Sequence, residues 1–140
     1  MNRTMKFAAA CLTVALGVAV AAANEKAPEG YVKAMKAIGD TNGKLRGLVT
    51  AKDYDGIAAA AAGLKPSVEL AGKYWADKKV EDATKLSTDV AKAVADLEKA
   101  AKAKDDAGIT AAAGVIGASC RTCHMAHRSE KLPDGSYEIK

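Results

Sequence analysis

Residues 120–124 of this 140-residue chain read Cys-Arg-Thr-Cys-His, and this C-x-x-C-H run constrains the fold more than any other stretch. Cys120 and Cys123 are about one helical turn apart, so their thiols face the same side of a helix. That spacing suits thioether bonds to the vinyl groups of a haem, and His124 follows directly as the proximal iron ligand. We therefore predict one haem c per chain, attached at Cys120 and Cys123, with His124 bound to the iron.

The same residues have two other interpretations. They could begin a zinc site in which His127 adds a ligand, but structural zinc requires four ligands that converge tetrahedrally. Side chains from so short a stretch of one helix point unevenly, so zinc is the weaker interpretation. Alternatively, Cys120 and Cys123 are ordinary packing residues of a helix. The match to the haem-attachment spacing favours haem over both.

The first 23 residues have the pattern of a secretory signal peptide. Arg3 and Lys6 form a basic start, residues 7–20 form a short apolar run, and the alanines up to Ala23 supply an A-x-A cleavage site. The run is too short to span a bilayer, so we expect cleavage near Ala23 and no stable membrane insertion.

Residues 24–140 are long enough for one domain and hardly long enough for two. They keep only the cysteines of the motif, so we expect no disulfide framework. A formal net charge of +4 for the whole chain does not indicate nucleic-acid binding. Aromatic residues make up only 4% of the sequence, so side chains alone would build a thin core that a buried macrocycle could complete.

Four stretches place apolar residues at the three- and four-residue spacing of amphipathic helices. They run from about Pro28 to Val49, from about Asp53 to Gly63, from about Val80 to Lys102, and from about Asp105 to between Arg128 and Lys131. Pro66 is expected to break or restart the second stretch, because proline removes a helical donor and clashes with the preceding turn.

No stretch alternates in the manner of a strand, and residues 132–136 read as a turn. In the first helical stretch, Gly39, Gly43 and Gly47 would let a neighbouring helix or a flat ring approach closely. Four helices with short connections predict an all-α, antiparallel four-helix bundle, with haem c near the C-terminal helix.

The sixth ligand of the iron is a separate question. Met125 and His127 belong to the same helix as His124, so they cannot reach the opposite face of the haem. Met35 is the methionine that remains elsewhere in residues 24–140, but a methionine at core spacing is usually packing filler. Arg128, one turn after His124, either contacts a haem propionate or is a solvated cation at the helix end.

The C-terminal run C-x-x-C-H-x-x-x-R, formed by Cys120, Cys123, His124 and Arg128, resembles the cytochrome c′ superfamily when it ends a four-helix pattern. The resemblance covers essentially the whole of residues 24–140 in order and length. It implies a four-helix bundle with covalently bound haem c. It also implies a periplasmic location, because bacterial haem of this type is attached outside the cytoplasm.

Two branches of the superfamily differ at the distal face of the haem. In cytochromes c′ the first helix offers no ligand, whereas in the low-spin cytochrome c-556 branch a first-helix methionine binds the iron. Set against the first-helix pattern, residues 35–45 (MKAIGDTNGKL) place Met35 at this distal position. The resemblance therefore implies the c-556 branch with His124/Met35 ligation. Many cytochromes c′ carry arginine one turn earlier, where this chain has Tyr31.

The resemblance implies a periplasmic monohaem electron carrier that is not an enzyme. The alternative is a five-coordinate cytochrome c′ that binds NO or CO at an open distal face. A haem peroxidase would need a distal acid–base residue, and His127 is on the proximal helix. We expect redox proteins of unknown identity as partners and no nucleic acid. The resemblance also allows a homodimer through the first two helices.

Overall fold

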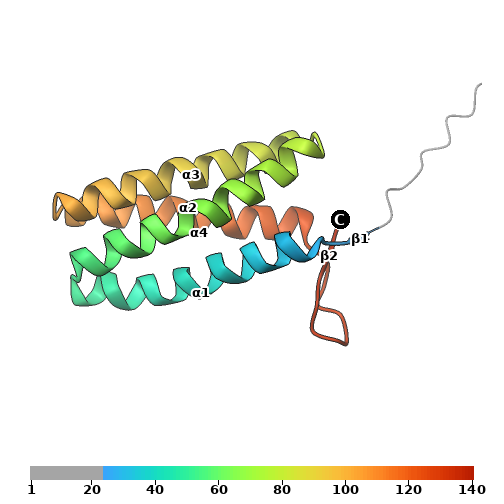
Figure 1. The fold of residues 1–140 in the computed structure, drawn as a ribbon, viewed down its shortest axis with the longest axis horizontal. Coiled ribbons are helices and arrows are strands. Elements are labelled where there is room, and N and C mark those ends of the chain that lie inside the picture. The colour runs from blue at the N-terminus through green and yellow to red at the C-terminus, as the bar shows by residue number, and fades with distance from the viewer. Residues whose placement is uncertain (1–23) are drawn as a thin grey trace, which may run out of the picture.

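The computed structural model describes residues 24–140, which form an antiparallel bundle of four helices (Figure 1). Helix α1 spans Glu29–Ala51, α2 spans Tyr54–Asp77, α3 spans Glu81–Lys102 and α4 spans Asp106–His127. Strands β1 (Glu25–Lys26) and β2 (Glu138–Ile139) pair antiparallel and join the two ends of this part of the chain. The predicted all-α four-helix bundle is confirmed. The predicted signal peptide lies outside the described residues.

Short connections and side-chain caps set the helix boundaries. The carboxylates of Asp53 and Asp105 accept the backbone N–H groups of Gly56 (2.9 Å) and Gly108 (3.0 Å), which caps the starts of α2 and α4. Each of the three connections contains a lysine with positive φ: Lys52 (52°), Lys79 (58°) and Lys104 (54°). Such left-handed residues end helices abruptly, which keeps the connections short and neighbouring helices antiparallel.

The expected break at Pro66 is wrong, because α2 continues through this residue. Leu64 and Val68 lie on either side of Pro66, are 2% and 3% exposed, and belong to the same buried cluster. Packing of one continuous face therefore outweighs the hydrogen bond that proline removes.

The C-terminal segment also differs from the expectation. Helix α4 ends at His127, because Arg128 has extended backbone and forms a bridge with Ile139. Residues 132–136 turn the chain back as predicted, so that β2 reaches β1. The sequence shows no strand-like alternation and leaves residues 137–140 undecided, because these two short strands depend on a long-range pairing.

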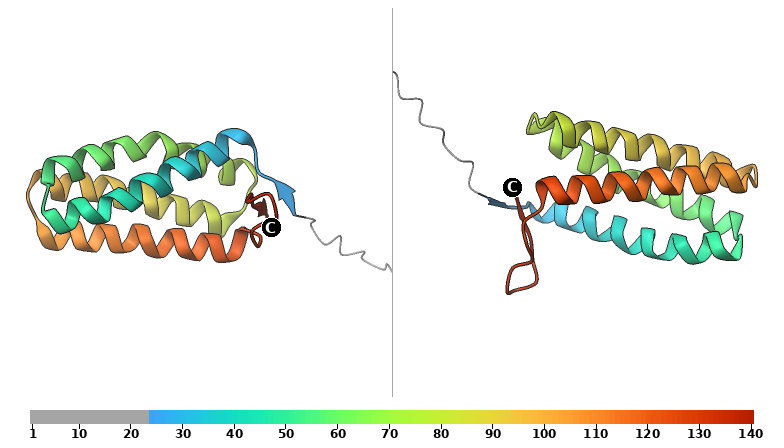
Figure 2. Two further views of the ribbon diagram at one scale, coloured as in Figure 1. Left: turned by 90° about the horizontal axis from the view of Figure 1, so that it is seen from below. Right: turned by 180° about the vertical axis from the view of Figure 1, so that it is seen from behind.

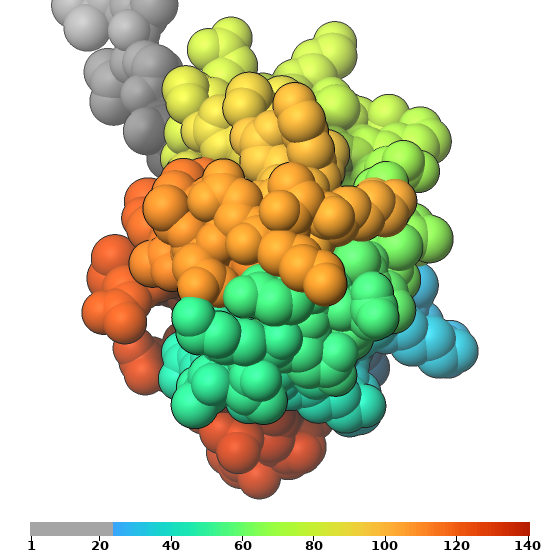
Figure 3. All heavy atoms as spheres, turned by 90° about the vertical axis from the view of Figure 1, so that its left-hand side faces the viewer, coloured from blue at the N-terminus to red at the C-terminus, as the bar shows by residue number. Residues whose placement is uncertain are grey.

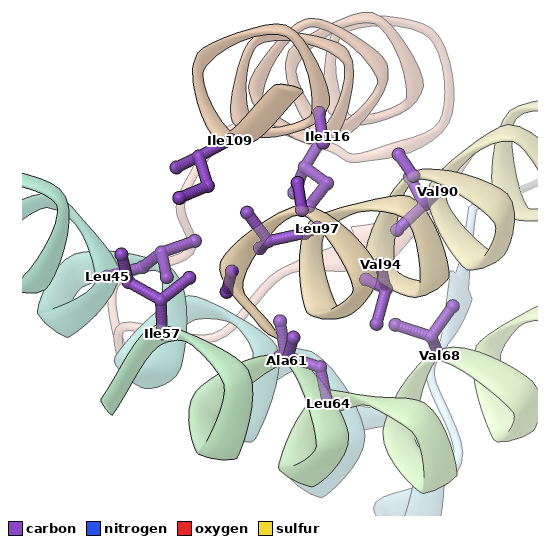
Figure 4. Close-up of a cluster of buried hydrophobic side chains, with 14 of the residues drawn as sticks. Leu45, Ile57, Ala61, Leu64, Val68, Val90, Val94, Leu97, Ile109 and Ile116 are labelled. Atoms are coloured by element: carbon purple, nitrogen blue, oxygen red, sulfur yellow. The ribbon is translucent and has the colours of Figure 1, made fainter. Parts of the chain in front are cut away.

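The buried side chains form two clusters. The first, here the loop-end cluster, fills the half of the bundle near the α1–α2 and α3–α4 connections (Figure 4). The second, here the terminal cluster, lies near the chain ends and comprises Ala27, Tyr31, Ala71, Trp75, Ala83 and Ile139. Helix α2 packs against α1 and α3, and α3 packs against α4, whereas α1 barely approaches α4.

The glycines of α1 do not serve a helix contact. A Cβ at Gly39, Gly43 or Gly47 would meet open space, so no neighbouring helix of residues 24–140 uses them for a close approach. The physical reason is that all three glycines lie on the exposed side of α1. Over the described range, none of the helices combines the length and apolarity that a membrane span requires.

Leu97 is 0% exposed at the centre of the loop-end cluster. We expect Leu97→Ala to lower the free energy of unfolding by about 2–5 kcal/mol, because it removes apolar contacts and leaves a cavity. Leu70→Ala is the control, since Leu70 is 44% exposed, and should cost less than about 1 kcal/mol. Urea denaturation followed by circular dichroism measures both; equal losses would contradict this placement of the core.

Glu98 of α3 links two helices through ion pairs with Lys102 of α3 and Lys65 of α2. Hydrogen bonds from Lys102 and then Lys65 lower the pKa of Glu98 to about 2. The ionised carboxylate therefore stabilises the fold fully above its unfolded pKa of about 4.3, and this contribution disappears as the pH falls toward 2.

We expect Glu98→Gln to destabilise the protein at neutral pH, with a difference from wild type that shrinks between about pH 4.3 and pH 2. Denaturation curves recorded across this range test the prediction. Glu69→Gln, on the exposed side of α2, is the matched control. A difference for Glu98→Gln that stays constant with pH would show that the ion pairs do not link α2 to α3 as described.

Candidate haem site

A cavity of about 230 Å³ lies between α1 and α4, and members of both buried clusters line it. We call it the α1–α4 cavity. In Figure 2, left, α1 separates from α4 toward the end that holds the chain termini. The view along the bundle shows an opening between α1 atoms in cyan and α4 atoms in orange-red (Figure 3). The helix pair that does not pack together therefore leaves a space inside the domain.

Helix α4 presents the predicted attachment residues to this cavity. Cys120, Cys123 and His124 line it, and their spacing of three and four positions puts them on one helix face. All three are half-buried, and the buried Ser119 lies beside them. Ile116, one turn earlier, is 0% exposed in the loop-end cluster and fixes the rotation of α4 against α3.

Burial sets the protonation of these groups. It raises the pKa of the Cys120 thiol, and it raises that of Cys123 to about 11, with smaller contributions from the negative charges of Cys120 and Asp82. Burial, with a smaller contribution from Arg128, lowers the pKa of His124. At neutral pH the site therefore offers two protonated thiols and a neutral imidazole, which is the form of histidine that binds metals.

The zinc interpretation finds no support. Within residues 24–140, no three histidine, cysteine or acidic side chains are arranged as ligands of one metal ion. His127, the proposed extra ligand, hydrogen-bonds to Asp82 (2.8 Å between Nε2 and Oδ2) and packs against Trp75 with 5.0 Å between the ring centres. It therefore connects α4 to α3 and α2. Its side chain is only 15% exposed, so His127 is a largely buried residue of the helix packing.

Met35 enters the α1–α4 cavity from α1, opposite the attachment residues on α4. It is partly buried and packs against both clusters. The structure thus brings Met35, Cys120, Cys123 and His124 to one cavity. Arg128 is not among the cavity residues; its guanidinium lies 4.3 Å from the centre of the Tyr137 ring. A propionate contact of Arg128 remains a prediction.

Two aromatic side chains complete the cavity wall, and the motif analysis did not assign them to the site. Tyr31 of α1 and Trp75 of α2 line the cavity, and Trp75 Nε1 donates a hydrogen bond to Tyr31 Oη (3.1 Å). Burial raises the pKa of Tyr31 to about 12, so this position is neutral and polar. The one-turn spacing of Tyr31 and Met35 is the signal that would have placed both on this wall.

The family model described as Cytochrome C′ matches residues 67–128, from the middle of α2 to the residue after α4. The matched segment includes Cys120, Cys123, His124 and Arg128 in order. This match supports the cytochrome c′ superfamily. The match does not include α1, so it tests neither the role of Met35 nor the branch of the superfamily. No curated protein and no solved structure matches the chain significantly.

The cytochrome c′ superfamily implies a haem cofactor, and the residues of the α1–α4 cavity fit one. Two half-buried thiols and a neutral imidazole come from one face of α4, and Trp75, Val68 and Val90 supply apolar wall. The gap between α1 and α4 interrupts the core at this level. A flat apolar group bound there would join the two buried clusters.

Removing the Tyr31–Trp75 hydrogen bond tests how much this wall of the site contributes to stability. We expect Tyr31→Phe to lower the free energy of unfolding by about 1–3 kcal/mol, because it leaves a buried indole N–H without its acceptor. Tyr54→Phe is the control, since the Tyr54 hydroxyl bonds to Asp106 at an exposed position. Its cost should stay within about 0.5 kcal/mol. Thermal or urea denaturation measures both, and equal effects would contradict the described bond.

Proposed function

We propose that the protein is an exported monohaem cytochrome that carries single electrons, with His124 and Met35 as axial ligands. One observation supports this most strongly: His124 of α4 and Met35 of α1 line the same cavity from two helices that barely approach each other. A ligand on each side of the gap is the arrangement that a six-coordinate iron requires.

Attached at Cys120 and Cys123, haem c would supply an iron that gains and loses one electron. The chain's own residues set how readily this happens. His124 is held neutral by burial and is available as a ligand. The soft thioether of Met35 favours ferrous iron and raises the reduction potential relative to a second histidine. Both helices are anchored in buried clusters, which favours ligand positions that change little between the two redox states.

Proteins of this superfamily are generally electron carriers or gas binders, and they are typically periplasmic. We infer that residues 1–23 direct export, in keeping with their basic, apolar and A-x-A pattern. We propose redox proteins as partners and no catalytic turnover. The distinction between electron transfer and gas binding then depends on Met35, because a filled distal position excludes CO and NO.

Replacing Met35 tests the proposal directly. We expect Met35→Ala to retain haem at Cys120 and Cys123 but to convert the iron from a low-spin form to a high-spin form that binds CO quickly. The reduced wild-type protein should give a sharp low-spin absorption spectrum that CO barely changes. Absorption spectra with and without CO, and the midpoint potential, are the measurements; we expect the potential to fall in the variant.

Met125→Ala is the matched control for this experiment. Met125 is on the same helix as His124 and is 67% exposed, so its loss should leave the spectrum and potential unchanged. A broad high-spin spectrum in the wild type that CO shifts at once would mean that Met35 is a packing residue of the core. Gas binding would then be the function of the protein. A low-spin spectrum that survives in Met35→Ala would show that another residue is the ligand.

A further inference from the structure

The α1–α4 cavity offers neutral polar groups but no cation. Among the described residues that line it, none is a lysine or an arginine. Apart from the attachment residues on α4, its polar side chains are those of Tyr31, Asn42, Ser87 and Ser119. A haem carries two propionate carboxylates, and a charge that leaves water is costly unless hydrogen bonds compensate it. A propionate that contacts this wall would therefore depend on neutral donors.

The hydroxyl of Tyr31 has an unused proton. Trp75 Nε1 donates to Tyr31 Oη (3.1 Å), and an indole nitrogen can only donate, so the oxygen is the acceptor in this bond. The structure gives the hydroxyl proton no acceptor among residues 24–140. Tyr31 is only 7% exposed, so water has little access to it. The proton therefore needs an acceptor from the cavity itself.

The other neutral donors of the cavity have alternatives that Tyr31 lacks. Ser87 already donates to the carbonyl of Ala83 (2.8 Å), four positions earlier in its helix. Ser119 can turn to its own helix in the same way. Asn42 is half-buried, so water reaches it. The Tyr31 hydroxyl stands at the end of a rigid ring and cannot reach the backbone of its own turn.

The aromatic neighbours of Tyr31 fix the position of this hydroxyl. The Tyr31 ring lies 4.4 Å from the Tyr74 ring and 5.9 Å from the Trp75 ring, measured between centres, and it meets Trp75 edge to face. Cys123 packs against the same terminal cluster, so the hydroxyl and one attachment residue belong to the same end of the cavity. The donor is thus in place before any cofactor binds, which reduces the entropy cost of the bond.

The chemistry of an attached haem leaves one kind of acceptor for this proton. Its four ring nitrogens bind the iron, and its vinyl groups form the thioether bonds to Cys120 and Cys123. The propionate carboxylates remain, and a carboxylate is the acceptor that makes the strongest bond with a hydroxyl. Burial raises the pKa of Tyr31 to about 12, so the hydroxyl keeps its proton at neutral pH.

We propose that Tyr31, held by Trp75, donates a hydrogen bond from its hydroxyl to a haem propionate. The proposal rests on haem attachment at Cys120 and Cys123, which belongs to the proposed function, but not on Met35 as the distal ligand. A bond to the ionised carboxylate favours ionisation. Because a negative propionate favours ferric iron, Tyr31 then sets the pH range over which the reduction potential falls.

Haem-loaded Tyr31→Phe tests the bond through the pH dependence of the midpoint potential. The potential falls as the pH rises through the propionate pKa. Without the donor from Tyr31 this pKa should rise by about one unit, so the fall should move to higher pH by the same amount. Between the two pKa values the variant should have the higher potential, and the two profiles should meet on either side. Spectroelectrochemical titration measures both proteins.

Tyr74→Phe is the matched control. Tyr74 packs against Tyr31, but its hydroxyl donates to Glu25 (2.9 Å), and it does not line the cavity. This variant should keep the wild-type profile. An unchanged profile in Tyr31→Phe would overturn the proposal, as would a profile that moves only in Arg128→Gln. An altered absorption spectrum without a shifted profile would mean that Tyr31 only holds α1 in place, which also overturns it.

Other charged groups lie near this wall but not on the cavity. Glu25 of β1 pairs with Lys78, and Asp82 of α3 bonds to His127 of α4. None of these four residues lines the cavity. His127→Asn identifies any part of the profile that belongs to the histidine. The shift caused by Tyr31→Phe should persist in that background, and its disappearance there would overturn the proposal.

A measurement on the unsubstituted protein covers the case in which Tyr31→Phe does not retain haem. Low-spin ferrous haem is diamagnetic, and so is ferrous haem with CO bound, so either distal state allows proton NMR. The Tyr31 hydroxyl proton should exchange slowly and show nuclear Overhauser contacts to propionate methylene protons. Contacts to neither propionate would overturn the role of Tyr31 alone. A chain whose mass shows no covalent haem would overturn the proposed function with it.

Discussion

Helix α4 is held in the bundle by α3, and the rest of the structure depends on this one-sided attachment. Ile109 and Ile116 fix α4 to the loop-end cluster with almost no exposure to solvent. Cys120 and Cys123 continue this same face of α4 toward the chain ends, at spacings of four and seven positions from Ile116. Because α1 does not pack along α4, these residues and His124 line the α1–α4 cavity. A bundle closed on all four sides would have buried the motif in a continuous core.

The end of the bundle near the chain termini is closed by segments from both ends of residues 24–140. Ile139 of β2 is buried in the terminal cluster with Tyr31 and Trp75, and the backbone N–H of Lys140 donates to the carbonyl of His127 (3.0 Å). The tail thus covers the last turn of α4 just beyond His124. This gives the residues after Arg128 a structural role: they keep water from the terminal cluster that backs the cavity.

Local pattern predicted the helices and the attachment residues, because both depend on spacing along one element. The apolar period of α3 and the aspartates at the starts of α2 and α4 are signals of this kind. Pro66 and the tail were not predictable in the same way. Whether α2 continues through a proline depends on what Leu64 and Val68 pack against, and β2 exists only because it meets β1. His127 likewise owes its place to Asp82 and Trp75, which lie on other helices.

The position of Met35 is the part of the site that most needs three-dimensional information. The C-x-x-C-H run fixes its own geometry, but a distal ligand depends on how α1 is placed relative to α4, which α1 barely approaches. Packing against α2 sets the position of α1. Tyr31, one turn before Met35, bonds to Trp75, and Ile38, one turn after it, is buried in the loop-end cluster. These two attachments fix the rotation and height of α1, and so hold the Met35 side chain toward the cavity rather than toward solvent.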